Sequence, residues 1–285
     1  MVLRVLEEFI EKEATEHRLK VGWMDALSHQ AKGGEDIFLL CFESVPSTQV
    51  VAHRALELVS EGVDGIVLTE LQTAGRGRSG RSWVGERGNF FCSFLVRCGV
   101  SLGELRGSSV VLGLVVVKVL EEFFKLSSDL LWLKWPNDLV DYGGRKLGGL
   151  LVEAEPRGDG TQMVIGVGIN LVCAPRGVKG TTCLREVLGE EGEEVFIGEQ
   201  VPALAWEMFE GFRKLLRDYS QGGIRRFLPQ LREKIWGVGK TFTVELGERV
   251  VKGISQGISD DGSLYLVNEY GEPYYLTSGH VIDVS

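Results

Sequence analysis

The chain has 285 residues, enough for one large domain or for a large and a small one. Hydrophobic residues make up 44% of it, and its formal net charge is −9. An acidic surface repels the phosphates of nucleic acid, so any polyanion site must be a local basic patch. The five cysteines are scattered and form no CxxC pair, which argues against zinc and disulfide frameworks and predicts reduced thiols.

The first residues mix acids and bases, which matches neither a secretory signal nor a transit peptide, so we expect a cytoplasmic protein. Residues 1–36 are expected to form a short helical extension that ends in a glycine-rich turn. The most apolar stretch, residues 109–119, is short and interrupted by Lys118. It predicts a buried core helix and no contact with a membrane.

Hydrophobic periodicity predicts the remaining elements in chain order. Expected strands cover 37–42, 65–71 and 89–96, then 130–135, and two more that pair through a turn at 157–160. Expected helices start at Ser47 (capped by Ser47 or Thr48) and cover 103–125, 201–216 and a segment ending near 235. Adjacent strands favour an α+β domain with a mixed or antiparallel sheet. After Gly237, short strands separated by turns predict a small all-β module, which gives an extension at 1–36, a large domain at 37–236 and a small one at 237–285.

Residues 72–89 form the most unusual stretch, with five glycines and four arginines and no periodicity, so we expect a loop. Gly75, Gly77 and Gly80 satisfy GxGxxG, but no helix follows, which excludes the dinucleotide fingerprint. Guanidinium groups bind phosphate oxygens in pairs, and glycines let a backbone wrap a ligand. The alternatives are a solvated surface loop or a nucleic-acid contact, and the acidic remainder of the chain disfavours the latter.

Three further motifs place polar residues at strand ends. In KWPND, Pro136 ends a strand and leaves Asn137 and Asp138 at its edge, although this is also ordinary turn chemistry. In RKLGGLL, Lys146 precedes two glycines, as if a ligand carboxylate lay over Gly148 and Gly149; the alternative is an exposed lysine at a strand end. In GVGIN, small residues leave space on a strand before Asn170, or mark a β-bulge.

Together, SVPST, QTAGRGRSGRSW, KWPNDL, RKLGGLLVE and GVGIN closely resemble the biotin protein ligase family, over about residues 40 to 175. The resemblance implies a mixed-sheet catalytic domain related to class II aminoacyl-tRNA synthetases, and a C-terminal SH3-like β-barrel. It also implies the activity: biotin reacts with ATP, with Mg²⁺, to give biotinyl-5'-adenylate, and biotin passes to a lysine of a biotin carboxyl carrier domain.

The resemblance carries functional residues onto this chain, motif by motif. It implies catalytic roles for Lys146, Arg78 and Asp138, with Asp138 orienting the acceptor lysine or taking its proton. The implied biotin-binding residues are Ser47, Thr48, Gln49, Gln72, Arg76, Gly77, Arg78, Trp83, Lys146, Gly148 and Gly149. The implied ATP and adenylate contacts are Arg78, Arg81, Asn137, Lys146 and Asn170. Gln49 stands where many members have Asn, and no residue is expected to bind a metal directly.

Many bacterial members of the family carry an N-terminal DNA-binding winged helix. About 36 residues precede Ile37 here, without a basic stripe, so we expect a monofunctional enzyme that does not bind DNA, as a monomer or homodimer. A lipoate ligase is the nearest alternative, because it also forms an acyl-adenylate, but its characteristic loop differs. A nucleic-acid-binding arginine loop is the alternative of another class, and it leaves Lys146 and the glycine-lined strands unexplained.

Overall fold

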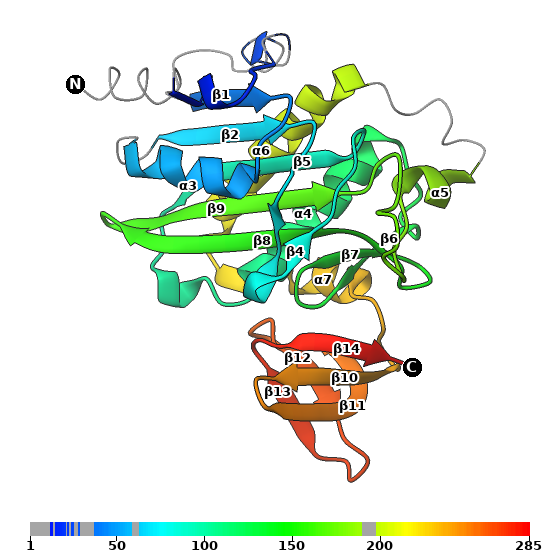
Figure 1. Ribbon diagram of the computed structural model, residues 1–285. Coiled ribbons are helices and arrows are strands. Elements are labelled where there is room, and N and C mark those ends of the chain that lie inside the picture. The colour runs from blue at the N-terminus through cyan, green and yellow to red at the C-terminus, as the bar shows by residue number, and fades with distance from the viewer. Residues whose placement is uncertain are drawn as a thin grey trace.

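The computed structural model describes residues 12–13, 15–20, 22, 24–25, 28, 37–58, 63–189 and 198–285. Most of the helical extension expected at 1–36 lies outside these residues. A large mixed sheet and a smaller antiparallel sheet organise the chain, and the smaller one lies at one end of the molecule (Figure 1). The expected α+β class is confirmed.

The large sheet has seven strands in the order β1-β2-β5-β9-β8-β7-β6. Only β1 and β2 pair in parallel, and the other pairs are antiparallel. The turn expected at 157–160 joins β8 and β9. The strands are β1 Ile37–Phe42, β2 Asp64–Thr69, β5 Phe90–Cys98, β6 Leu131–Lys134, β7 Asp138–Asp141, β8 Lys146–Arg157 and β9 Gly160–Ile169.

Helices cover both faces of this sheet. Successive strand residues point to opposite sides, so neighbouring residues pack against different helices. Val67 and Leu95 pack under α3, whereas Ile66 and Phe94 face the core beneath α4 and α6 (Figure 1). The helices are α3 Thr48–Leu58, α4 Ser108–Phe123, α5 Leu184–Leu188, α6 Val201–Tyr219 and α7 Leu228–Lys234, with 3-10 turns at η2 Leu102–Glu104, η4 Gly198–Gln200 and η5 Gly223–Phe227.

Helix α4 is apolar on most sides because it lies between the sheet and α6, as expected for the stretch 109–119. It begins later than predicted. Gly107 adopts a left-handed conformation with φ of 72°, which separates η2 from the helix, so the helix begins at Ser108 and not near Gly103. Among the described residues, no helix is long and apolar enough to cross a membrane. All five cysteines are free, as expected.

The five strands predicted after Gly237 are all present, in the order β13-β12-β11-β10-β14. Buried Phe242 and Leu266 centre their core, as alternation along the strands requires. This sheet contacts the larger part through α7 and β11, and Trp236 Nε1 donates to the Tyr142 carbonyl at 2.9 Å. The strands are β10 Thr241–Leu246, β11 Arg249–Ile258, β12 Leu264–Val267, β13 Pro273–Leu276 and β14 His280–Val284.

Candidate active site

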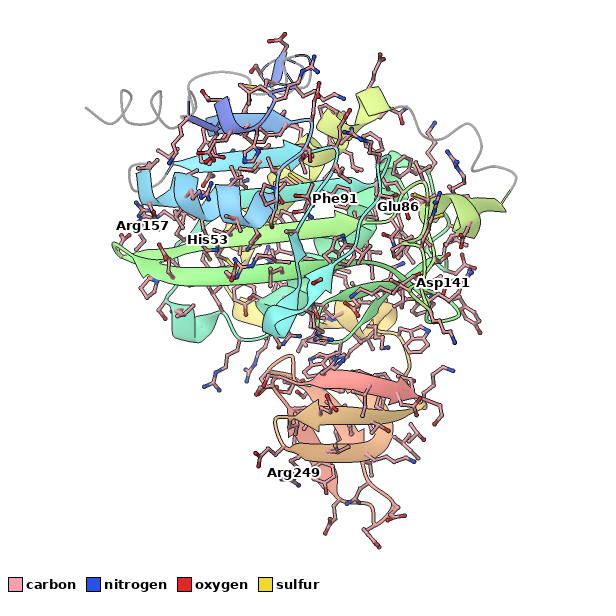
Figure 2. The ribbon with its side chains drawn as sticks, viewed as in Figure 1. His53, Glu86, Phe91, Asp141, Arg157 and Arg249 are labelled. Carbon is pink, nitrogen blue, oxygen red and sulfur yellow. The ribbon has the colours of Figure 1, made fainter. Side chains whose placement is uncertain are left out.

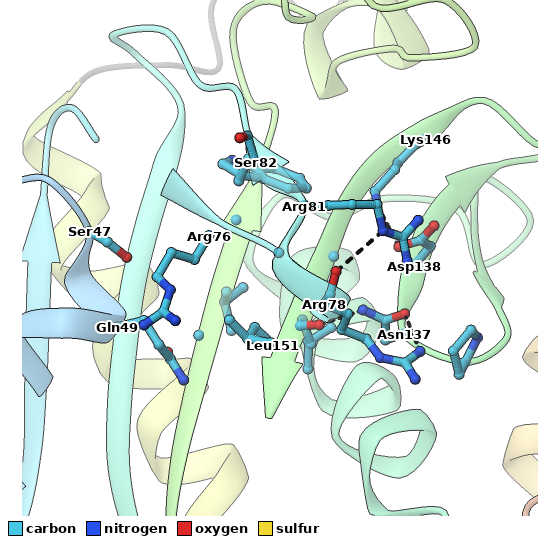
Figure 3. Close-up of a pocket in the computed structure, with 18 of the residues that line it drawn as sticks. Ser47, Gln49, Arg76, Arg78, Arg81, Ser82, Asn137, Asp138, Lys146 and Leu151 are labelled. Atoms are coloured by element: carbon cyan, nitrogen blue, oxygen red, sulfur yellow. Dashed lines mark hydrogen bonds and ion pairs between the residues drawn. The ribbon is translucent and has the colours of Figure 1, made fainter. Parts of the chain in front are cut away.

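An open pocket with a cavity volume of about 160 Å³ lies on the large sheet, at the end that faces the small sheet. Its floor comes from β8 and β9, through Gly149, Leu151 and Gly168. The stretch 76–83 covers it, and the KWPND turn forms a side wall (Figure 3). Residues 279–281 of the small sheet complete the wall. Four segments far apart in the sequence therefore meet in one pocket.

The arginine-rich stretch is more ordered than the loop we expected. It forms a small hairpin of β3 Gly75–Arg76 and β4 Ser82–Trp83, with the turn η1 Arg78–Gly80 between them. The Gly77 amide donates to the Arg81 carbonyl at 2.7 Å. Gly75 is required here, since a Cβ on it would lie 2.5 Å from the Trp83 carbonyl oxygen.

The glycines of GVGIN make room for two side chains of the protein itself. A Cβ on Gly168 would lie 2.6 Å from the Trp83 ring, and one on Gly166 would lie 2.5 Å from Gln49 Oε1. Strand β9 keeps regular register with both neighbours through this stretch, so the β-bulge alternative is wrong. The missing side chains thus seat the tryptophan and the glutamine against the floor.

One end of the pocket is cationic. Lys146 Nζ lies 2.6 Å from Asp138 Oδ1 and 5.3 Å from the centre of the Trp83 ring. Arg78 donates from Nη1 to Asn137 Oδ1 at 3.2 Å. Among the described residues that line the pocket, Asp138 supplies the single carboxylate, and Arg78, Arg81, Lys134 and Lys146 supply four basic side chains at this end. The fifth, Arg76, lies beside Gln49 (Figure 3). A chain of net charge −9 therefore presents a local anion site at the cationic end.

Desolvation at this end favours a bound anion. Burial lowers the pKa of Arg78, with Arg81 acting in the same direction and Asp138 opposing it. Burial also lowers the pKa of Lys134, which Asp138 raises and Lys146 lowers. Crowded cations without enough carboxylates gain stability when an anionic ligand neutralises them.

The other end of the pocket, which we call the neutral end, is rich in uncharged hydrogen-bonding groups, and Arg76 lies beside Gln49 there (Figure 3). Gln72 Oε1 accepts from the Thr48 amide at 2.9 Å, which turns the carboxamide nitrogen of Gln72 away from Thr48. The Thr48 hydroxyl lies 2.9 Å from Ser93 Oγ. Ser47 Oγ is buried and has no partner. Ser47 therefore does not cap α3, although the sequence predicted that it could. An unpartnered buried hydroxyl beside a pocket is available to a polar ligand.

The small sheet also contributes to the site. Arg81 Nη1 lies 2.9 Å from the ring nitrogens of His280, at the start of β14. Burial and Arg81 both lower the pKa of His280. This contact ties the arginine-rich hairpin to the C-terminal strands.

The structure brings together most of the residues singled out from the sequence. The exceptions are Gly148 and Asn170, which do not line the pocket. A Cβ on Gly148 would lie 2.8 Å from the Gly168 carbonyl oxygen, so close strand packing accounts for this glycine. Asn170 is buried and donates from Nδ2 to the Thr182 carbonyl at 3.0 Å, while its Oδ1 has no partner.

Sequence reasoning missed four polar residues of the pocket, Ser82, Ser93, Lys134 and His280. Lys134 belongs to the quoted KWPND motif, and Ser93 is the one hydroxyl in the apolar run FFCSFLV, so a sequence signal existed for both. His280 carried no such signal, because its contact depends on how the small sheet packs.

Comparisons with known proteins agree with this geometry. Residues 41–170 match the model of the Biotin/lipoate A/B protein ligase family. The chain is 34% identical over 243 residues to the bifunctional ligase/repressor BirA of Escherichia coli K12, covering 83% of this chain and 70% of that protein. It is 33% identical over 207 residues to the biotin–[acetyl-CoA-carboxylase] ligase of Paracoccus denitrificans, covering 70% of this chain and 82% of that protein.

The fold has a solved counterpart. The biotin protein ligase of Aquifex aeolicus, in complex with biotin and ATP, aligns with a TM-score of 0.68 at 27% identity, covering 87% of this chain and 98% of that one. The fold and the pocket thus define a protein of the biotin and lipoate ligase class. Within it, this chain belongs to the biotin protein ligase family, the ATP-dependent ligases that form biotinyl-5'-adenylate and transfer the biotin to a protein.

Proposed function

We propose that the neutral end of the pocket binds the ureido ring of biotin and that the cationic end binds the phosphates of ATP. The observation that carries the proposal is this polarity within one pocket. Ser47 and Gln49 lie on one side of the view, and Lys146 and Asp138 lie on the other (Figure 3). Biotin has a neutral head and a carboxylate tail, so this arrangement directs its tail toward the cations and the α-phosphate.

In the first step, a carboxylate oxygen of biotin attacks the α-phosphorus of ATP, the bond to the bridging oxygen breaks, and pyrophosphate leaves. Lys146 and Arg78 stabilise the negative charge on the phosphoryl oxygens, and Arg81 binds phosphate. Lys146 is already directed by Asp138, and Trp83 lies beneath it, so it can approach the reacting carboxylate without a large rearrangement.

In the second step, the neutral amine of an acceptor lysine attacks the acyl carbon and AMP leaves. Asp138 is the carboxylate of the pocket, so it can orient the amine or take its proton. The adenylate reacts readily with water, and the hairpin that carries Arg76, Gly77 and Arg78 excludes water from it.

The donor set fits Mg²⁺ as an ion that arrives with the nucleotide. Among the described residues, no group of three His, Cys, Asp or Glu side chains could hold a metal alone. Mg²⁺ is commonly held by one or two carboxylates together with substrate phosphates and water. In contrast to the expectation from the sequence that no residue binds a metal directly, Asp138 and Asn137 Oδ1 would hold it here, and it would neutralise charge on the phosphates.

Asn170 is assigned to the adenine. Its buried Oδ1 has no partner and can accept from an exocyclic amine, which supports the assignment; the residue does not itself line the pocket. Gly149 leaves space beside the Lys146–Asp138 pair for the biotin carboxylate, since a Cβ there would lie 3.2 Å from Asp138 Oδ1.

We assign residues 37–236 to the catalytic domain and 237–285 to the SH3-like domain, which meet at Arg81 and His280. We propose that the acceptor is a lysine of a biotin carboxyl carrier domain and that the protein is cytoplasmic. The name of the Paracoccus relative gives acetyl-CoA carboxylase as the protein on which that relative acts.

The decisive experiment is biotin labelling of a carrier domain. Labelling that requires both ATP and biotin is the expected result, and replacing the acceptor lysine with arginine should abolish it. Calorimetric titration with biotin and with lipoate separates the two members of the ligase class. Binding of lipoate without biotin would contradict the proposal and favour a lipoate ligase.

A further inference from the structure

A chain of hydrogen bonds runs from the neutral end of the pocket to the protein surface under α3. Ser93 Oγ donates to Gln49 Oε1 at 3.0 Å, and Gln49 Nε2 donates to Glu153 Oε2 at 2.7 Å. His53, on α3 (Figure 2), lies with Nε2 2.8 Å from the same carboxylate oxygen. Glu153 and His53, the outer two residues of this series of hydrogen bonds, do not line the proposed biotin site.

The carboxylate of Glu153 determines which way the Gln49 amide points. Nε2 of Gln49 donates to Glu153 and to the Val164 carbonyl at 3.3 Å, so both of its hydrogens face acceptors. A reversed amide would place its oxygen against that carboxylate and that carbonyl. Burial alone would raise the pKa of Glu153, but the hydrogen bonds from Gln49 and His53 and the nearby Arg76 lower it overall, so the carboxylate is the acceptor.

This orientation passes to Thr48. Because Gln49 presents its oxygen, Ser93 must donate its one hydroxyl proton to it. Ser93 Oγ is then an acceptor, and the Thr48 hydroxyl donates to it at 2.9 Å in preference to Gln72 Oε1, which lies at 3.3 Å. The proton of Thr48 is thus used within the protein, on the acceptor that Gln49 and Glu153 set. Thr48 Oγ1 therefore has only acceptor capacity left for a ligand.

The inference concerns how the pocket recognises a cyclic urea, and it rests on the proposed biotin site. We infer that Glu153, held by His53, is a positioning residue that makes Thr48 Oγ1 an acceptor for a ureido N–H. The free Ser47 hydroxyl and the Gln72 amide nitrogen then supply donors for the ureido carbonyl. The pocket thus matches the donor and acceptor pattern of the urea, and a carboxylate outside the pocket sets that match.

Gln49 makes the link possible through its length. Its buried side chain spans from Ser93 to Glu153, and Gly166 leaves room for its oxygen, since a Cβ there would lie 2.5 Å from Oε1. Asparagine, which the family resemblance leads us to expect at this position, is one methylene shorter. Gln49, which departs from the asparagine expected here, therefore connects the biotin site to Glu153.

The test compares Glu153→Ala with Glu153→Gln in the full chain, with Glu155→Ala as a charge-matched control on the same strand. Glu153→Ala should raise the KM for biotin about tenfold, the effect of one lost hydrogen bond, and leave the KM for ATP unchanged. Glu153→Gln should stay near wild type, because its carboxamide oxygen still accepts from Gln49. Glu155→Ala should match wild type. Equal impairment of the two Glu153 variants would overturn the inference.

A second readout separates positioning from a general loss of packing. Carbamate analogues of biotin, in which an oxygen replaces one ureido N–H, should bind the wild type more weakly than biotin does. In Glu153→Ala this discrimination should shrink, because the acceptor is no longer directed. Ser93→Ala removes the hydrogen bond from Ser93 to Gln49 and should reduce this discrimination by the same amount. It provides the test even if Glu153→Ala does not fold. Unchanged discrimination in Ser93→Ala would overturn the inference, whereas a wild type that binds no biotin would overturn the proposed function instead.

Discussion

The guanidinium of Arg81 and the imidazole of His280 meet across the junction of the two sheets, with Nη1 2.9 Å from the ring nitrogens. An arginine only donates, so the nearest ring nitrogen of His280 must accept, and the contact requires a neutral imidazole. The C-terminal strands therefore stabilise the hairpin over the pocket through one hydrogen bond that acid can break.

We expect this contact to make stability depend on pH. Burial and Arg81 lower the pKa of His280 in the folded protein below its unfolded value of about 6.5. The unfolded chain then binds the proton more tightly, so the contribution is complete above pH of about 6.5 and is lost as the pH falls through the folded pKa. Wild type should lose more unfolding free energy than His280→Gln between about pH 7 and pH 5. Parallel pH profiles in denaturant titrations would contradict the role of His280.

Replacing Lys146 should abolish adenylate formation and leave the fold intact. Lys146→Ala removes the cation beside Asp138 and should lose about 2–4 kcal/mol of transition-state stabilisation. Pyrophosphate release measures the first step directly. Its control is Lys118→Ala, a substitution at an exposed position on α4. Release at the wild-type rate from Lys146→Ala would rule out the assignment.

Replacing Arg78 should make the enzyme release its intermediate. Arg78 lies in the hairpin and bonds Asn137 across the pocket, so Arg78→Ala opens one closing contact and removes no core packing. Chasing labelled biotin should then reveal faster dissociation of biotinyl-adenylate, with an unchanged melting temperature. A dissociation rate equal to that of the wild type would count against Arg78 as part of the lid.

A methyl group at Gly168 should displace the hairpin. A Cβ there would lie 2.6 Å from the Trp83 ring, closer than real Cβ contacts, so Trp83 must move off the floor. Gly168→Ala should weaken adenylate retention, whereas Gly103→Ala, where nothing lies within 4 Å of a Cβ, should not. Wild-type retention in Gly168→Ala would show that the tryptophan does not hold the lid.

Ligands should protect the hairpin from trypsin. The stretch 72–89 contains five glycines and four arginines, so like charges repel within a chain of high conformational entropy. Biotin and ATP together supply anions and an apolar surface for Trp83, which should suppress cleavage after Arg76, Arg78, Arg81 and Arg87. Cleavage after Arg249, on the small sheet away from the pocket (Figure 2), serves as the internal control. Equal cleavage of the hairpin with and without ligands would remove its role as a lid.

Element types were predictable because hydrophobic periodicity is a local signal. The β8–β9 hairpin and the five C-terminal strands lie where that signal predicts them. Helix and strand boundaries that depend on the backbone conformation of a single residue were harder to predict from the sequence. Helix α4 begins at Ser108 because Gly107 has a φ of 72°, and composition does not reveal that angle. The β3–β4 hairpin was missed because two-residue strands leave no periodic pattern.

The sequence by itself determined the family, the chemistry and most of the pocket, because the side chains that handle phosphate and carboxylate lie in short contiguous motifs such as GRGRSGRSW and KWPND. Only the tertiary structure decided which groups meet across those motifs. It placed His280 against Arg81, seated Trp83 on Gly168, and joined Gln49 to Glu153 and His53. These contacts join residues up to 199 positions apart in the chain, and hydrogen bonds and packing depend on distance in space, which local sequence patterns do not encode.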